Sequence, residues 1–317
     1  MHKVKIAFHK IDVSKHSWCN EATLISIEGG LGSLKKTYYG IYERESYSSQ
    51  IFSAITLNGK QLVQSKVHSC GSCGGMLATG YGIDENDKEI KEIRDISEAI
   101  NSEFESLEKS VEDMKPLLGL LEDGLYVIAD IPLYPTDGFG NFFWAVPNEE
   151  ADAGVIEWHG WTDTYASPKF LYPSQSTDLF DPARVDHYIK NVSKKSAPRA
   201  VAYKLDGFMC VLLDGHHKAT ASALSSVPVN CITIIPLDGV GRKNDILYFG
   251  RIEVDKKDLP EEMQHLAKNK SLQLKNLPTD ETFEGTIIKK KWEQKYLESG
   301  KNFPSVESLL TQSRIHR

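Results

Sequence analysis

The sequence predicts an α/β (α+β) fold made of two units. A β-rich N-terminal domain with one long helix is expected over residues 1–160, and an α/β domain with a helical C-terminal tail over residues 161–317. Hairpin signals near the N-terminus, one long helical stripe and a later alternation of strand and helix patterns support this division. The 317 residues, 40% hydrophobic and 26% charged, suit two ordinary globular domains.

Short strands are expected in the first 85 residues. The dipeptide Asn58-Gly59 is typical of a two-residue hairpin turn, and strand-forming residues flank it on both sides. The other candidate segments are rich in β-branched and aromatic residues. We expect strands at 22–27, 37–42, 51–55 and 61–63.

One amphipathic helix is expected over residues 87–115, because apolar residues recur there at intervals of three or four, and Pro116 should end or kink it. A buried strand follows at 125–129. Aromatic residues then gather from Tyr126 to Tyr172, and we expect them to pack between the two units or to line a ligand cleft. The aromatic cluster expected closest to the second unit's functional loop is Trp158, His159 and Trp161.

The second unit reads as a compact αβαβ pattern. Asp181-Pro182 should begin a helix, since Asp caps helices and Pro suits the first helical position. Buried strands are predicted at 200–204, 208–213 and 229–235, with a short helix of small residues at 219–224. Further helices are expected at 261–269 and 279–296.

The loop Asp214-Gly215-His216-His217-Lys218 joins a predicted buried strand to a predicted helix. Unpartnered N–H groups and the dipole at a helix start favour anions, and glycine permits close backbone approach. Lys218 adds a cation, histidines can donate to phosphate or move protons, and Asp214 can help hold Mg²⁺. The alternative is that Asp214 simply caps a helix beside two surface histidines.

Residues 165–240, with this loop and Val227-Pro228-Val229, resemble the ParB/sulfiredoxin-like superfamily. That superfamily includes CTP-binding partition proteins, sulfiredoxins, ParB-like nucleases and kinases of free serine. The resemblance implies a nucleotide site that serves phosphoryl transfer or hydrolysis. It implies cofactor contacts at Gly215, His217, Lys218 and Ala219 and catalytic roles for Asp214, His216 and His217.

The loop departs from the sequences of most members. Partition proteins carry Gly-Glu-Arg-Arg here, and His216 stands where sulfiredoxins have their catalytic cysteine. The free-serine kinases carry Asp-Gly-His, a polar residue and usually Arg, so Lys218 keeps the charge but not the bidentate fork. These kinases use a carboxylate near the preceding helix as base. Asp178 and Asp181 are the candidates, although neither is Glu.

A second motif lies in the N-terminal unit. Cys70 and Cys73, two residues apart among glycines, form a knuckle typical of structural zinc sites. His16 and Cys19 have the same gap, so the four could bind one zinc ion, with His68 as a competing ligand. Unliganded structural thiols or a redox dithiol are the alternatives.

The composition of the chain limits which partners and which cellular location can be expected. The net charge of −7 makes nucleic acid an unfavourable partner, and an odd number of cysteines, five, argues against a disulfide framework. There is no apolar stretch of the ~20 residues that a membrane span needs, and no signal peptide, so we expect a cytoplasmic protein.

The sequence supports two hypotheses about function. The first is a nucleotide-dependent phosphotransferase or hydrolase that uses Mg²⁺ with ATP or ADP and a small-molecule acceptor. The second is a non-catalytic module that binds nucleotide, nucleic acid or protein.

Overall fold

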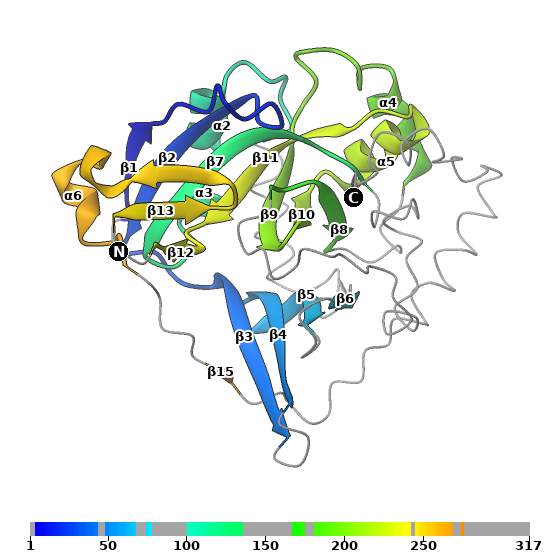
Figure 1. Cartoon of the computed structure of the whole chain (residues 1–317). Helices are drawn as coiled ribbons and strands as arrows, with labels where there is room; N and C mark the ends of the chain where they lie inside the picture. The colour runs from blue at the N-terminus through cyan, green and yellow to red at the C-terminus, as the bar shows by residue number, and fades with distance from the viewer. Residues whose placement is uncertain are drawn as a thin grey trace.

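The computed structural model describes residues 4–43, 48–67, 74–77, 100–135, 167–174, 181–241, 245–268 and 274–275 (Figure 1). Its largest sheet has seven strands, in the spatial order β1 (Lys5–Lys10), β2 (Glu21–Glu28), β7 (Gly124–Leu133), β11 (Val229–Pro236), β9 (Ala200–Asp206), β10 (Met209–Asp214) and β8 (Phe170–Pro173). Two smaller sheets accompany it. One contains β15 (Leu274–Lys275), β3 (Leu34–Glu43), β4 (Ser48–Leu57), β5 (Lys60–Val67) and β6 (Gly74–Leu77), and the other β12 (Gly239–Val240), β13 (Ile246–Phe249) and β14 (Ile252–Asp255).

Few helices accompany these sheets in the described ranges. They are α2 (Leu107–Asp113), α3 (Lys115–Leu118), α4 (Pro182–Ile189), α5 (His216–Leu224), α6 (Glu261–Gln264) and the 3-10 turn η4 (Lys256–Asp258). The chain therefore has mixed α/β content dominated by one large mixed sheet. None of the helices in the described ranges has the length and apolar character needed to cross a bilayer.

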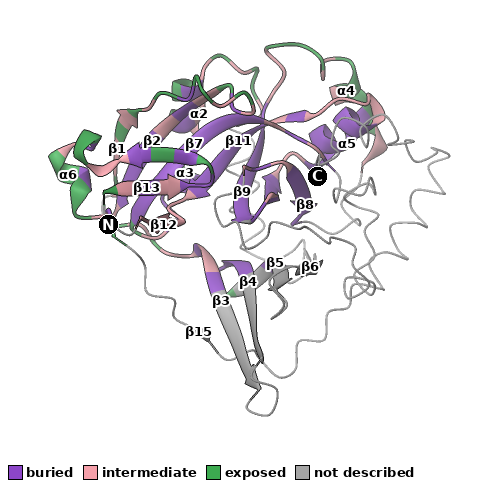
Figure 2. Ribbon diagram, in the orientation of Figure 1, coloured by how far each residue is buried: buried purple, intermediate pink, exposed green. Residues whose placement is uncertain are grey.

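The large sheet has a core on each face, because successive side chains of a strand point to opposite sides. Ile25, Ile128 and Ile234 belong to a core shared with α2, α3 and the five-stranded sheet. Leu24 and Val127 belong to a second core shared with α5, the three-stranded sheet and α6. Figure 2 shows the central strands and α5 as the continuously buried part of the molecule.

One edge of this sheet collects the elements of the candidate site. β8 is parallel to β10, and β9 is antiparallel to β10 and parallel to β11. The carboxyl ends of β8 and β10 therefore meet the amino ends of β9 and β11. Helices α4 and α5 pack together beside these strands (Figure 1).

Several local predictions are confirmed. The expected N-terminal strands correspond to β2, β3, β4 and β5, and Asn58-Gly59 forms the two-residue turn that pairs Leu57 with Lys60. Asp181 caps α4 through a bond from the Ala183 N–H to its carboxylate, 2.9 Å long, with Pro182 in the first turn. The strands expected at 125–129, 200–204, 208–213 and 229–235 are β7, β9, β10 and β11.

The helix predicted over 87–115 is not continuous, because it is broken at residues 101–106. Residues 101–106 are not helical, and α2 begins only after Ser106, whose hydroxyl accepts a 3.1 Å bond from the Lys109 N–H. A serine that caps a new helix outweighs apolar spacing, because the cap satisfies N–H groups left open at a helix start. Residues 87–99 lie outside the described residues, and Pro116 sits in the first turn of α3.

The large sheet contains strands from both sides of the domain boundary predicted at residue 160. β7, from the predicted first unit, pairs antiparallel with β11 of the second from Val229↔Leu133 to Pro236↔Tyr126. Two smaller corrections concern the C-terminal part. α6 ends at Gln264, short of the expected residue 269, and β14 was not expected at all. The helix predicted at 279–296 lies outside the described residues.

Candidate functional site

The turn between β10 and α5 is built around one glycine. Gly215 has φ 97° and ψ 27°, in the left-handed region that favours glycine, and it is the N-cap of α5. A Cβ atom here would lie 2.7 Å from Cβ and 3.0 Å from Cα of Ala200, the first residue of β9. Glycine is therefore required at this position because the backbone of residue 215 lies close to Ala200 of β9.

The helix after this turn starts earlier than the sequence indicated. α5 begins at His216 instead of Ala219, so His216, His217 and Lys218 occupy its first turn, and all three are buried. Ala219, predicted to contact the cofactor, donates its N–H to the Gly215 carbonyl over 2.8 Å. That amide therefore belongs to the helix, and anion binding would fall to the first-turn N–H groups, which have no partner within a helix.

The first histidine holds the end of β8. His216 Nε2 accepts a 3.0 Å bond from the backbone N–H of Ser174, and the Ser174 hydroxyl donates to the Leu212 carbonyl on β10. Burial lowers the pKa of His216 to about 3. The imidazole is therefore neutral near pH 7, and its acceptor role at Nε2 places the proton on Nδ1.

The second histidine holds the start of α4. His217 Nε2 accepts a 2.9 Å bond from the backbone N–H of Asp181, whose own carboxylate caps α4. Consecutive imidazoles thus bind the backbone on both sides of residues 175–180. Asp178, the other candidate base, lies within that range and outside the described residues.

The lysine of the motif is buried and bonded inside the protein. Lys218 Nζ donates to the Arg199 carbonyl over 2.8 Å and to Asp214 Oδ2 over 3.3 Å. It also lies 5.8 Å from the centre of the Tyr188 ring. Its charge therefore balances that of Asp214, whose side chain is 15% exposed at the carboxyl end of β10.

A buried ion pair that sequence reasoning missed supports this arrangement. Arg199 binds Asp130 on β7 through two bonds, Nε to Oδ1 at 3.0 Å and Nη2 to Oδ2 at 3.1 Å. Its guanidinium also lies 3.7 Å from the centre of the Phe104 ring. These contacts fix the carbonyl that Lys218 binds. The sequence could have indicated this ion pair, because Asp130 is the one charged residue in the otherwise apolar strand β7 and a buried charge needs a partner.

The motif thus brings together two kinds of group. The carboxylate of Asp214 could hold a cation, and the backbone of the first turn of α5 could hold an anion. The ring Nε2 atoms of His216 and His217 and the ammonium of Lys218 are engaged with protein atoms. In this geometry the two imidazoles position backbone segments, and neither Nε2 is available for proton transfer to a ligand.

The structure describes only two of the four residues of the predicted zinc site, so the zinc site stays a prediction. Cys19 is buried and its thiol donates to the Glu21 carbonyl over 3.4 Å, and burial with the nearby Asp130 carboxylate raises its pKa to about 12. Burial lowers the pKa of His16, whose Nε2 is enclosed without a partner among the described residues. Cys70 and Cys73 lie outside the described ranges, as does His68, and the described residues contain no metal-binding cluster of His, Cys, Asp or Glu.

The expected aromatic wall also falls on undescribed residues. Trp158, His159 and Trp161 lie within 136–166, which the structure does not describe, so their predicted position beside the loop stays a prediction. Two further cysteines, Cys210 and Cys231, are buried in β10 and β11.

Comparison with known proteins adds no relative to this picture. No protein-family model, no curated protein and no solved structure matches the chain.

Proposed function

We propose that this chain is a nucleotide-dependent phosphoryl-transfer or nucleotide-hydrolysing enzyme of the ParB/sulfiredoxin-like type, and in its most specific form a cytoplasmic small-molecule kinase. One observation carries the proposal. A left-handed glycine ends a buried strand beside an aspartate and opens a helix at the edge of a mixed sheet. Helix starts that follow a strand and a glycine turn are recurrent phosphate-binding structures.

In this proposal, each residue of the motif has a role that follows from its contacts. The first turn of α5 would receive the phosphates, with Lys218 supplying the nearby positive charge. Asp214 would hold Mg²⁺, which neutralises charge on nucleotide phosphates when bound. His216 and His217 would act as positioning residues, since each already accepts a backbone N–H bond through Nε2.

Two aspartates, Asp178 and Asp181, are candidates for the general base. The carboxylate of Asp181 accepts the Ala183 N–H as the cap of α4, so proton abstraction by Asp181 would compete with that bond. Asp178 lies outside the described residues. Asp178 and Asp181 therefore both remain candidates for the general base that acts on an acceptor hydroxyl.

A second candidate function is a binding module without turnover. The observation that favours it is the bonding of Lys218 to Arg199 and Asp214, which already neutralises the motif's cation. Such a module would recognise a nucleotide or a protein and would transmit binding through α5. The acidic net charge of −7 weighs against nucleic acid.

Calorimetry with ATP, ADP, CTP and GTP in the presence of Mg²⁺ tests the proposal. Lys218→Ala should weaken nucleotide binding about 10- to 150-fold, the equivalent of ~1.5–3 kcal/mol for a charged hydrogen bond. Lys204→Ala is the matched control, because Lys204 is equally buried but pairs with Asp238 over 2.7 Å at a different place on the sheet.

The outcomes separate the two candidates. Binding followed by release of ADP or AMP with an acceptor supports the enzyme. Binding without turnover, in an acceptor panel of alcohols and amines, supports the module. If none of the four nucleotides binds, the enzyme proposal fails in this form.

A further inference from the structure

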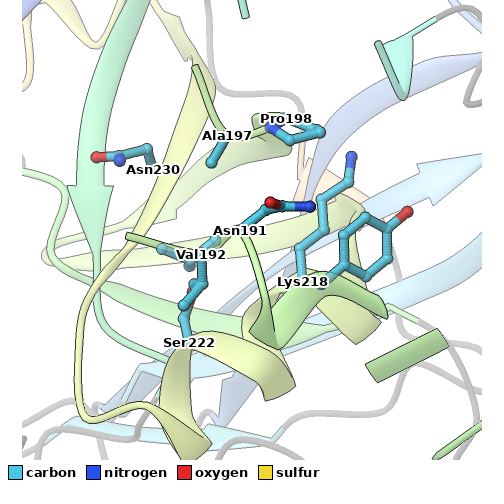
Figure 3. A pocket seen from close by; sticks show the side chains of 9 residues that line it. Asn191, Val192, Ala197, Pro198, Lys218, Ser222 and Asn230 are labelled. Atoms are coloured by element: carbon cyan, nitrogen blue, oxygen red, sulfur yellow. The ribbon is translucent and has the colours of Figure 1, made fainter. Parts of the chain in front are cut away.

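A separate pocket opens behind the first turn of α5. It lies between the end of α4, the turn formed by residues 191–198, α5 and the start of β11 (Figure 3). The enclosed space is about 20 Å³ measured with a water-sized sphere, so the pocket takes only a small ligand. It is at the same edge of the sheet as Asp214, because the amino end of β11 meets that edge. The site proposed above does not use it.

One side chain in the pocket lacks what a buried polar group needs. Ser222 is 1% exposed and lines the hollow from α5. Its hydroxyl has no hydrogen-bond partner among the residues that the structure describes. A buried hydroxyl without a partner is costly, so in native proteins such groups are normally satisfied by a ligand or a water molecule.

The remaining polar walls match a neutral ligand. Asn191 brings a primary amide, which donates and accepts, and Asn230 lines the pocket at the start of β11. The Tyr188 hydroxyl bonds to Asn101 Oδ1 at 3.5 Å, and its oxygen can still accept. Among the described lining residues Lys218 is the one charged side chain, and its ammonium is already 3.3 Å from Asp214 Oδ2. An additional ionic group would therefore find no uncompensated charge in this lining.

The apolar part of the wall sets the size of the ligand. Val192, Pro198 and Val229 surround the polar groups, so a short aliphatic portion would be shielded there while its polar end reaches Ser222. Figure 3 shows the side chains of Asn191, Val192, Ser222 and Lys218 gathered around this space, whereas the amide of Asn230 points away from them.

We propose that this pocket binds a small neutral molecule that carries a hydroxyl or primary amide group on a short aliphatic chain, with Ser222 as its central hydrogen-bonding residue. The stem of Lys218 forms part of the wall while its ammonium binds Arg199 and Asp214. The occupant is therefore one side chain away from the Asp214–Lys218 motif. The proposal does not depend on nucleotide binding or on turnover.

Titration of the isotope-labelled full-length chain with acetamide and with propane-1,2-diol, followed by backbone amide chemical shifts, tests this site without any nucleotide. We expect saturable shifts at α5, at the 191–198 turn and at the start of β11. The affinity should be in the millimolar range, because so few atoms make contact. Sodium acetate, a charged analogue of acetamide, should give no saturable shift at these positions.

Two variants and one control assign the binding to the hydroxyl. Ser222→Ala should weaken binding of both probes about 2- to 10-fold, the usual net worth of one neutral hydrogen bond. Ser222→Val should do the same by placing a methyl group at the position of the hydroxyl, and Ser222→Ala remains decisive if the larger side chain prevents folding. Ser225→Ala, at the C-cap of the same helix and outside the lining, should leave binding unchanged.

Three outcomes would overturn the proposal. They are the absence of saturable shifts with either probe, equal shifts with acetate, and unchanged affinity in Ser222→Ala. The last result would mean that the hydroxyl is satisfied by water alone.

Discussion

Gly215→Ala should destabilise the protein through two effects that the structure separates. The first is backbone strain, because φ 97° is a conformation that alanine adopts only at a cost of ~1–3 kcal/mol. The second is a clash, because the new Cβ would lie 2.7 Å from the Ala200 Cβ, and overpacking of this kind costs ~1–3 kcal/mol. The sum is a loss of roughly 2–6 kcal/mol of unfolding free energy.

Gly59→Ala supplies the matched control. Gly59 has a similar φ of 84° in the hairpin turn, but a Cβ there would meet nothing within 4 Å. This variant should therefore show the strain alone. The difference between the two variants measures the crowding of the new Cβ against Ala200 of β9 and against Lys218 Cδ, which would lie 3.2 Å away.

The assay is urea unfolding at constant pH, with the free energy taken by linear extrapolation and the slope compared between variants. Ala200→Gly in the Gly215→Ala background should recover part of the loss, with a coupling energy of ~1–2 kcal/mol. Recovery should be incomplete, because the Ala200 Cα remains 3.0 Å from the new Cβ. If Gly215→Ala costs no more than Gly59→Ala, or if the double variant shows no coupling, the steric explanation is wrong.

Three further predictions address charge and metal. Since His216 has its pKa lowered to about 3, the unfolded state binds more protons than the folded state between pH 6.5 and 3. Stability should therefore fall as the pH falls through that window, by at most ~5 kcal/mol, and His216→Gln should flatten the slope in acid unfolding curves. Asp130→Asn should cost ~3–5 kcal/mol in urea unfolding, because it leaves Arg199 buried without its counter-ion, and a joint replacement of both by apolar residues should cost less. If the knuckle at Cys70 and Cys73 binds zinc, metal analysis of protein purified without chelators should find close to one equivalent of zinc, and Cys73→Ser should remove it. The control Cys231→Ser should reduce stability and retain the metal. Protein without a transition metal would contradict the zinc prediction.

The elements predicted correctly are those determined by neighbouring residues. Asn58-Gly59 produces a two-residue turn because both residues tolerate positive φ, here 50° and 84°. Asp181 and Pro182 open α4 because one accepts an N–H bond and the other lacks an N–H to satisfy. Such signals need no tertiary information, and for that reason the sequence alone reveals them.

The errors have a common physical origin in contacts between distant residues. Pairing of β7 with β11 joins segments on both sides of the predicted boundary at residue 160, and no local composition reports that pairing. The helix predicted over residues 87–115 misses the break before α2, because the spacing of apolar residues does not reveal the N-cap at Ser106. The sequence also could not indicate which atoms the histidines contact, since Ser174 and Asp181 reach them only in the folded chain.

The contacts of the motif change how its chemistry should be interpreted. Histidines beside a glycine turn suggested proton transfer, but His216 and His217 each accept a backbone N–H through Nε2. Protonation of that nitrogen would remove both bonds and would detach Ser174 and Asp181 from the start of α5. The neutral imidazoles therefore fix the shape of the turn, and the capacity for ligand chemistry shifts to Asp214 and to the backbone of the first helical turn. An enzyme at this edge would consequently depend on its histidines for geometry, so their replacement should impair ligand binding and stability together instead of turnover alone.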